Sequence, residues 1–311
     1  MTYSSLLAQS PFLRGCIEAG ARLSLMLAKR EEANFVRHSK GAGGDISIGA
    51  DLLCEAEFGK ELLGLASFDS EEGGFIQCNG EGSDIIVLDP LDGSDNYLSN
   101  IPYYGASLAL CDKNGSVKEA CIINFCSGEV FYDRLDFGVD FARESSLNTS
   151  SNSSDATYNK DGNKQSKQDE VFPRYTKLHL FRKEILKSTY CIESNAKSML
   201  SQMPQTLAQA RPKCGIFERA YCNPTVVAKL HNHNIKFRSL GAGALSLVYA
   251  LESRFLLLGG KSRHYDAKAG QFLARDLHIG EIVDKNGAFF LLVSKYKEVF
   301  DMISKILLDS K

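Results

Sequence analysis

Short apolar runs separated by turn residues make up the first half of the chain. Apolar residues at near-helical spacing predict an amphipathic helix over residues 12–33 and a second helix over 50–65. The run 85–88 predicts a buried strand that ends at Asp89-Pro90, because proline cannot donate a ladder hydrogen bond. Apolar stretches between residues 106 and 132, separated by turn residues, predict an antiparallel meander.

From residue 175 onward, strand-like and helix-like patterns alternate. The pattern predicts strands at 178–181, 189–192, 255–258, 282–283 and 288–293, and helices at 195–203, 225–231 and 299–308. Residues 144–170 hold almost no apolar groups and cannot offset the entropy of ordering. We therefore expect an α+β N-terminal domain (1–143), a polar loop or linker (144–174) and an α/β C-terminal domain (175–311).

Composition limits the classes of function. The chain has 311 residues, of which 44% are hydrophobic, and its formal net charge of -2 provides no broad attraction for nucleic acid or an anionic membrane. No segment is apolar enough to span a bilayer, and the N-terminus lacks the pattern of a signal peptide. Nine scattered cysteines without a CxxC pair predict reduced thiols in a cytoplasmic protein.

An acidic loop follows the strand at 85–88. Asp89, Asp92 and the Leu91 carbonyl can point three hard oxygen donors at one spot, which suits Mg²⁺ or Mn²⁺. A calcium-binding EF-hand is excluded, because the twelfth position counted from Asp89 is Asn100 rather than Glu. A solvated surface turn is the remaining alternative for this loop.

The next residues predict a phosphate site beside the acidic loop. Gly93 lets the backbone approach closely, and Ser94, Asp95 and Asn96 are good N-cap residues. Free N–H groups at a helix N-terminus are a favourable seat for phosphate. Metal and phosphate could thus share one loop.

Other acidic residues indicate a functional site only if they lie close to this loop in the fold. Asp51 lies in the first turn of the second helix, Glu71-Glu72 precede two glycines, and Asp266 stands at a loop-to-helix junction. Alone, these residues are typical of helix caps and solvated turns. Beside Asp89 and Asp92 they would complete a carboxylate cluster.

Taken together, these segments resemble the inositol monophosphatase and fructose-1,6-bisphosphatase superfamily of metal-dependent phosphatases. The similarity rests on an Asp-Pro-x-Asp-Gly-Ser element followed by a late Asp-x-x-Ala-Gly element, and it spans most of the chain. The matching segments are residues 40–51, Ser70-Glu71-Glu72, Asp89 to Asn96, Ser239-Leu240-Gly241 and Tyr265 to Gly270. The resemblance implies an α+β fold, layered as an α-β-α-β-α sandwich.

The resemblance also implies residue roles. Two Mg²⁺ ions, or Mn²⁺, would be held by Glu71, Asp89, the Leu91 carbonyl, Asp92 and Asp266. Asp51 would help to hold a third ion or orient water. The catalytic residues would be Asp51, Ser94 and Glu71, with Asp51 and Ser94 positioning and deprotonating the attacking water. Phosphate or substrate would contact Gly93, Ser94, Gly241 and Asp266, while Glu72 and Lys40 support the site.

Departures from the family pattern leave the substrate open. Tyr265 replaces the usual Trp, Lys268 replaces a small residue, and the family's acidic sugar-binding residue corresponds to a position near Gly259. The expected substrate is a small phosphorylated metabolite such as an inositol or sugar phosphate. The basic run 261–264 could instead hold the second phosphate of a nucleoside 3′(2′),5′-bisphosphate or fructose 1,6-bisphosphate, or be a solvated turn.

Two further questions stay open at this level. A noncatalytic regulatory protein that keeps the fold and uses residues 144–170 as its contact is the alternative to an enzyme. Homodimers are common among proteins that the chain resembles, and a homodimer is one assembly open to it.

Overall fold

The computed structural model describes residues 2–78, 80, 83–135, 171, 173–188 and 211–309. The polar stretch 144–170, the strand expected at 189–192 and the helix expected at 195–203 lie outside these residues. Most of the linker expected at 144–174 lies outside them as well.

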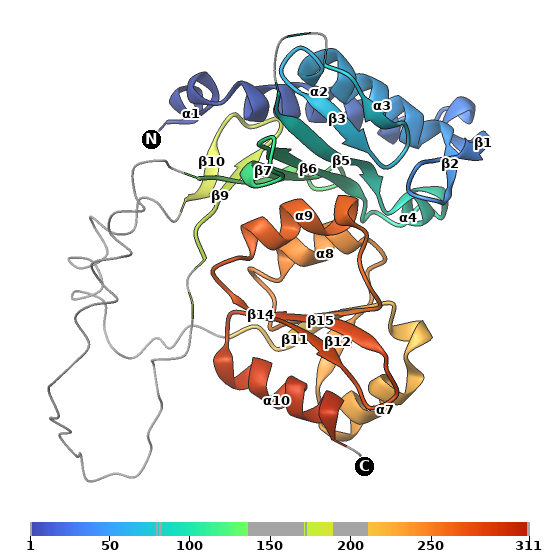
Figure 1. Ribbon diagram of the computed structural model, residues 1–311, viewed down its shortest axis with the longest axis vertical. Helices are drawn as coiled ribbons and strands as arrows, with labels where there is room; N and C mark the ends of the chain where they lie inside the picture. Colours follow the sequence, from blue (N-terminus) through green and yellow to red (C-terminus); the bar gives the residue numbers. More distant parts are fainter. Residues whose placement is uncertain are drawn as a thin grey trace, which may run out of the picture.

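The upper half of the molecule is built on an eight-stranded sheet (Figure 1). Its strand order is β10-β9-β8-β7-β6-β5-β3-β4, and all neighbours are antiparallel except the parallel pair β3 and β5. The meander predicted from the sequence is present as β6, β7 and β8. The strands are β3 (Ser67–Ser70), β4 (Gly74–Ile76), β5 (Ile85–Asp92), β6 (Gly105–Cys111), β7 (Val117–Asn124), β8 (Glu129–Arg134), β9 (Thr176–His179) and β10 (Ile185–Ser188).

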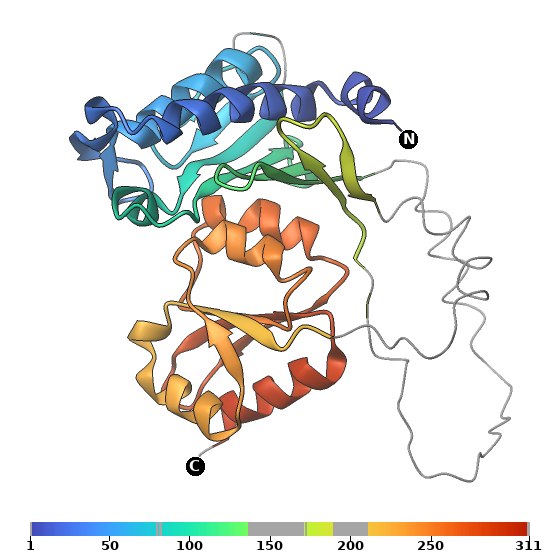
Figure 2. The same cartoon turned by 180° about the vertical axis from the view of Figure 1, so that it is seen from behind.

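Helices cover the outer face of this sheet. Figure 2 shows α2 (Pro11–Ala28) running along that face beside α3 (Gly49–Leu62), and α1 (Tyr3–Gln9) precedes them. Helix α2 begins at Pro11 because the Ser10 hydroxyl accepts a hydrogen bond from the Leu13 amide at 2.9 Å. Its apolar stripe is buried, as the helical spacing predicts, but the helix ends at Ala28 rather than near residue 33.

The lower half contains a five-stranded sheet with the order β12-β11-β13-β15-β14. Helices α8 and α9 lie between the two sheets, and α7 and α10 cover the far side of the lower sheet (Figure 1). This arrangement confirms the predicted α-β-α-β-α layering. The elements are β11 (Cys214–Glu218), α7 (Pro224–Asn232), β12 (Lys236–Arg238), α8 (Gly243–Tyr249), β13 (Leu256–Gly259), α9 (His264–Leu273), β14 (His278–Val283), β15 (Phe289–Ser294) and α10 (Lys297–Leu308).

Short elements complete the described fold and lie near the junction of the halves. They are the 3-10 helix η1 (Glu32–Phe35), the hairpin of β1 (Arg37–Lys40) and β2 (Ile46–Ile48), α4 (Ser94–Leu98) and the 3-10 helix η3 (Ala220–Cys222).

The middle helical layer joins the halves through one apolar core. Leu245, Leu247 and Val248 of α8 pack in the same buried cluster as Ala109 of β6 and Leu256 of β13. Two further cores fill the spaces under α2 and α3 and between the lower sheet and α10. Within the described residues, no helix combines the length and apolar character needed to cross a bilayer.

Two sequence expectations differ from the fold. Strand β5 does not end at Asp89-Pro90 but continues to Asp92, because an extra residue is accommodated as a bulge between the pairs Asp89–Ser107 and Asp92–Gly105. Strands β9 and β10, which the sequence assigns to the C-terminal domain beginning at residue 175, instead belong to the upper sheet, where β9 pairs with β8 and β10 pairs with β9.

The register opposite Asp92 depends on Gly105. A Cβ atom at this position would lie 2.0 Å from the Ile123 carbonyl oxygen. We therefore expect Gly105→Ala to lower the free energy of unfolding, measured by urea denaturation, by roughly 2 kcal/mol or more. Gly64→Ala is the control, since its Cβ meets nothing within 4 Å; equal stability of the two variants would contradict this packing.

Candidate functional site

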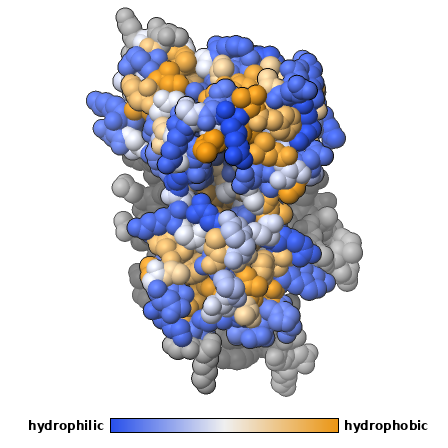
Figure 3. Space-filling view, turned by 90° about the vertical axis from the view of Figure 1, so that its right-hand side faces the viewer, coloured by the Kyte–Doolittle hydropathy of each residue, from blue (hydrophilic) through white to orange (hydrophobic). Residues whose placement is uncertain are grey.

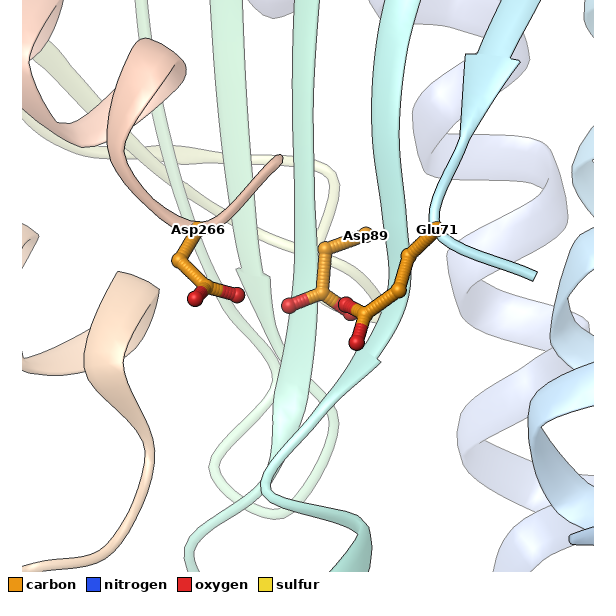
Figure 4. Close-up of side chains that lie close together, drawn as sticks. All are labelled: Glu71, Asp89 and Asp266. Carbon is orange, nitrogen blue, oxygen red and sulfur yellow. The ribbon is translucent and has the colours of Figure 1, made fainter. Parts of the chain in front are cut away.

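Three buried carboxylates from three elements converge at the junction of the two halves (Figure 4). Glu71 follows β3, Asp89 lies in β5, and Asp266 lies in the first turn of α9. One oxygen from each lies within 4.8 Å of the others. Three of the predicted metal ligands, separated by up to 195 positions in the sequence, therefore meet at one point.

Strand pairing explains why Glu71 and Asp89 lie side by side. Strands β3 and β5 are parallel, Ser70 is in register with Leu88, and the Glu71 amide donates to the Leu88 carbonyl at 2.9 Å. The next residue of each strand is therefore the carboxylate. Helix α9 packs against β5, β6 and β7 and brings Asp266 to the same level.

Asp92 serves a different local purpose. Its two carboxylate oxygens each accept a hydrogen bond at 2.8 Å, one from the Gly243 amide and the other from the Leu245 amide. These donors lie in the first turn of α8, so Asp92 ties the upper sheet to the middle layer. The Leu91 carbonyl, also predicted as a ligand, lies 3.1 Å from the Ser94 hydroxyl.

The predicted catalytic pair is in contact. The Ser94 hydroxyl lies 3.0 Å from Asp51 Oδ1, and Asp51 Oδ2 accepts the Ile48 amide at 2.7 Å. Burial raises the pKa of Asp51 to about 6, although the hydrogen bond from Ile48 opposes the shift. Asp51 is thus a carboxylate of raised basicity that holds a hydroxyl facing the cleft.

Burial also perturbs the carboxylates of the cluster. It raises the pKa of Glu71 to about 8, against the opposing charge of Arg263, and that of Asp92 to about 7. The pKa of Asp89 is held well above its ordinary value by burial and by the charges of neighbouring acids. Such a cluster costs free energy when fully ionised unless a cation neutralises it.

The remaining predicted residues lie around the cluster. Glu72 accepts a hydrogen bond from the Ser47 hydroxyl, and burial raises its pKa. Lys40 is exposed and lines the cleft. Gly241 has a φ of +86°, and a Cβ there would lie 2.9 Å from Asn96 Oδ1, so the Ser239-Leu240-Gly241 turn requires glycine at its end.

Two residues hold that turn in place, and the sequence analysis did not predict this role for either. Glu218, at the end of β11, accepts the Leu240 amide at 3.1 Å and the Gly241 amide at 2.9 Å. Asn96 Nδ2 donates to the Leu240 carbonyl at 2.7 Å from the opposite half. The sequence signal for Glu218 was a lone acid at the end of the apolar run Ile216-Phe217.

The basic run 261–264 contacts acids rather than standing apart from them. Arg263 forms ion pairs with Glu71, Asp266 and Asp45 at 2.5, 3.1 and 2.8 Å. His264 Nε2 lies 2.8 Å from Asp69 Oδ2. At least these two members of the run are therefore engaged within the protein.

The cluster opens into a cleft of about 950 Å³ lined by residues of both halves. The space-filling view shows the molecule narrowing between its halves, with hydrophilic residues on both sides of the waist (Figure 3). A second cavity of about 640 Å³ lies in the lower half beside Tyr296 and Arg254. The larger cleft has room for a small metabolite beside the acids.

The donor set fits a hard divalent cation. Carboxylate and carbonyl oxygens are the ligands that Mg²⁺ and Mn²⁺ prefer, and no thiol or imidazole stands among Glu71, Asp89 and Asp266. The guanidinium of Arg263 contacts two of these acids, which shows that the cluster accommodates a positively charged group.

Comparison with known proteins places these residues in context. The sequence profile of the inositol monophosphatase family matches residues 8–296. A 96-residue segment is 34% identical to the fructose-1,6-bisphosphatase/inositol-1-monophosphatase of Methanothermobacter thermautotrophicus, covering 27% of this chain and 34% of that protein. A 62-residue segment is 40% identical to the Nus factor SuhB of Pseudomonas aeruginosa, covering 20% and 22%.

The chain thus matches these two relatives over about a third of their length or less. The holo fructose-1,6-bisphosphatase of Leishmania major shares the fold across almost the whole chain, with a TM-score of 0.64 and 13% identity over 98% of this chain and 97% of that one.

A substitution of Glu218 tests whether its carboxylate holds the turn at Gly241 in place. Glu218→Gln places an amide NH₂ where a carboxylate accepts two partly buried backbone N–H groups, so one donor loses its acceptor. We expect the free energy of unfolding to fall by about 1–3 kcal/mol in urea denaturation. Glu298→Gln, at an exposed ion pair with Arg211, should change it by less than about 0.5 kcal/mol; similar values for both variants would contradict the assignment.

Proposed function

Because the chain belongs to the inositol monophosphatase family, we propose that it hydrolyses a phosphate monoester of a small metabolite with divalent metal ions as cofactors. The products are inorganic phosphate and the free alcohol. The convergence of Glu71, Asp89 and Asp266 at the floor of a cleft is the observation that carries the proposal.

The metal ligands in this proposal are those three carboxylates together with Asp92 and the Leu91 carbonyl. Divalent cations in such a site offset the charge of the phosphoryl oxygens, lower the pKa of the attacking water and stabilise the leaving oxygen. Carboxylates alone would repel an anionic substrate. Mg²⁺ is the proposed ion, with Mn²⁺ as a second choice, and their number is two or three.

Asp51 and Ser94 position the attacking water. The Ser94 oxygen accepts a hydrogen bond from water, and Asp51, 3.0 Å from that oxygen, takes up the proton through the hydroxyl. A carboxylate with a pKa of about 6 is ionised at neutral pH and remains basic enough for this transfer. Glu71 completes the proposed catalytic set from its place in the acid cluster.

Other residues hold the substrate and support the acids. The amides of Gly93 and Ser94 contact the phosphate, and the turn at Gly241 contacts the alcohol portion, with Asp266 facing both. Glu72 supports its neighbour Glu71, while Lys40 adds positive charge at the cleft wall. An inositol or sugar phosphate is the first candidate substrate.

A substrate with a second anionic group is the other candidate, and Arg219 favours it. Arg219 lines the cleft, and its Nη1 donates to the Gly259 and Lys261 carbonyls at 3.4 and 3.3 Å. A guanidinium therefore lies against the segment where the family's acidic sugar-binding residue is expected. A positive group in place of a negative one suits a nucleoside bisphosphate or fructose 1,6-bisphosphate better than a neutral polyol.

Retention of every metal-binding acid of the family pattern supports an enzyme over a noncatalytic regulatory protein. A metal cluster has no evident use in a protein that only docks a partner. We infer a cytoplasmic location from the nine scattered cysteines, and a homodimer stays a prediction.

Metal-dependent turnover is the direct test of the proposed function. Phosphate release should be measured across inositol, sugar and nucleoside phosphates, with Mg²⁺ and with EDTA. We expect release only with Mg²⁺, and a decrease of about a hundredfold or more in Asp89→Asn and Asp92→Asn, because each loses a charged oxygen donor. Asp301→Asn, on the exposed face of α10, is the matched control and should keep full activity. Turnover that persists in EDTA would refute the proposal.

Arg219 separates the two substrate classes. Arg219→Gln should raise KM for bisphosphate substrates about tenfold or more, the value of a lost charge-assisted hydrogen bond, and leave KM for monophosphates unchanged. Arg238→Gln, a neighbouring arginine outside the cleft, serves as the control. A bisphosphate KM that does not respond to Arg219→Gln would exclude this role.

A further inference from the structure

Arg263 occupies an unusual position for a cation in a cluster of this kind. It is the residue before α9, three positions ahead of Asp266, and its side chain is one-third exposed. Its guanidinium contacts acids that come from both halves of the molecule. Glu71 belongs to the upper half and Asp266 to the middle layer.

The contacts use the oxygens that a metal ion would need. Nη1 lies 2.5 Å from Glu71 Oε1, while Nε and Nη2 lie 3.1 and 3.3 Å from the two oxygens of Asp266. The fork of the guanidinium therefore engages both oxygens of one carboxylate and one oxygen of another. A divalent cation bound by the same oxygens would lie within contact distance of a positive group.

The energetics favour this arrangement as long as no other cation is bound. The side chain of Arg263 is one-third exposed, and its guanidinium hydrogen-bonds to both oxygens of Asp266, so it places a positive charge beside the buried acids without being fully removed from solvent. Without a positive partner, the buried acids would have to take up protons or repel one another.

We propose that Arg263 is an internal counter-ion that neutralises the carboxylate cluster in the metal-free protein and must leave it for divalent ions to bind. This inference rests on the proposed metal site. Arg263 and the metal compete for the same oxygens, so each metal-binding event includes the cost of breaking the Arg263 ion pairs. Asp45, an exposed acid 2.8 Å from Nη1, keeps the displaced guanidinium at the edge of the cleft.

Competition makes a prediction opposite to that for an ordinary supporting residue. Loss of a supporting residue weakens metal binding, whereas loss of a competitor strengthens it. We expect Arg263→Gln to bind Mn²⁺ about tenfold or more tightly than the wild-type protein in isothermal titration calorimetry. Arg263→Lys, which keeps the charge but lacks the fork, should lie between the two.

Thermal unfolding supplies a second readout that needs no turnover. Arg263→Gln should lower the melting temperature in EDTA, and saturating Mn²⁺ should reduce that deficit, because the metal replaces the lost counter-ion. Arg37→Gln is the matched control: it removes an arginine that lines the same cleft, and its Mn²⁺ affinity should stay within about twofold of the wild-type value if long-range charge is screened.

Each outcome separates this inference from the proposed function. If the wild-type protein binds Mn²⁺, and Arg263→Gln and Arg263→Lys bind it with equal or weaker affinity, the counter-ion role is overturned and the metal site is retained. A failure of the wild type and all variants to bind Mn²⁺ would overturn both. An equal gain in affinity in Arg37→Gln would show a general effect of charge and would also overturn the specific role of Arg263.

Discussion

Mutual repulsion of buried carboxylates is the constraint on which this structure depends. Glu71, Asp89 and Asp266 are each less than a tenth exposed, and their oxygens lie within 4.8 Å of one another. No hydrophobic gain arises from bringing acids together, and the cost is met only by protons, a guanidinium or metal ions. A fold that maintains such a cluster maintains a binding site for positive charge, and the architecture around it can be understood as the means of holding the acids in place.

The middle helical layer provides that means. Helices α8 and α9 are packed between both sheets. The first turn of α8 donates amides to Asp92 of the upper sheet, and the first turn of α9 carries Asp266. Asp92 accepts two amides of α8, and Asn96 and Glu218 clamp the turn ahead of it from opposite halves. The halves are thus connected by directional hydrogen bonds at the site and by an apolar core behind it. Rigid support of this kind keeps carboxylates at fixed separation without relying on a mobile loop.

Local patterns in the sequence carried most of the fold. The meander and α2 each depend on nearby residues, so periodicity and turn residues were sufficient to predict them. The strand end expected at Asp89-Pro90 was wrong, because the bulge that carries β5 on to Asp92 depends on pairing with β6. The pairing of β9 with β8 was not visible, because strand partners far apart in sequence leave no local signal. The same limit applies at the site: composition identified the acids, and a family resemblance grouped them. The amide bonds of Asp92, the clamp formed by Glu218 and the direction of Arg263 depend on tertiary contacts.

The parallel pairing of β3 with β5 has a consequence for how this site tolerates change. Glu71 and Asp89 follow residues that are in register, so the spacing between neighbouring strands, about 4.8 Å, sets the distance between their backbones. The length of the connection between β4 and β5 does not affect the distance between the backbones of Glu71 and Asp89. Insertions and deletions there can accumulate during evolution at little entropic cost while the geometry of the two acids is inherited unchanged.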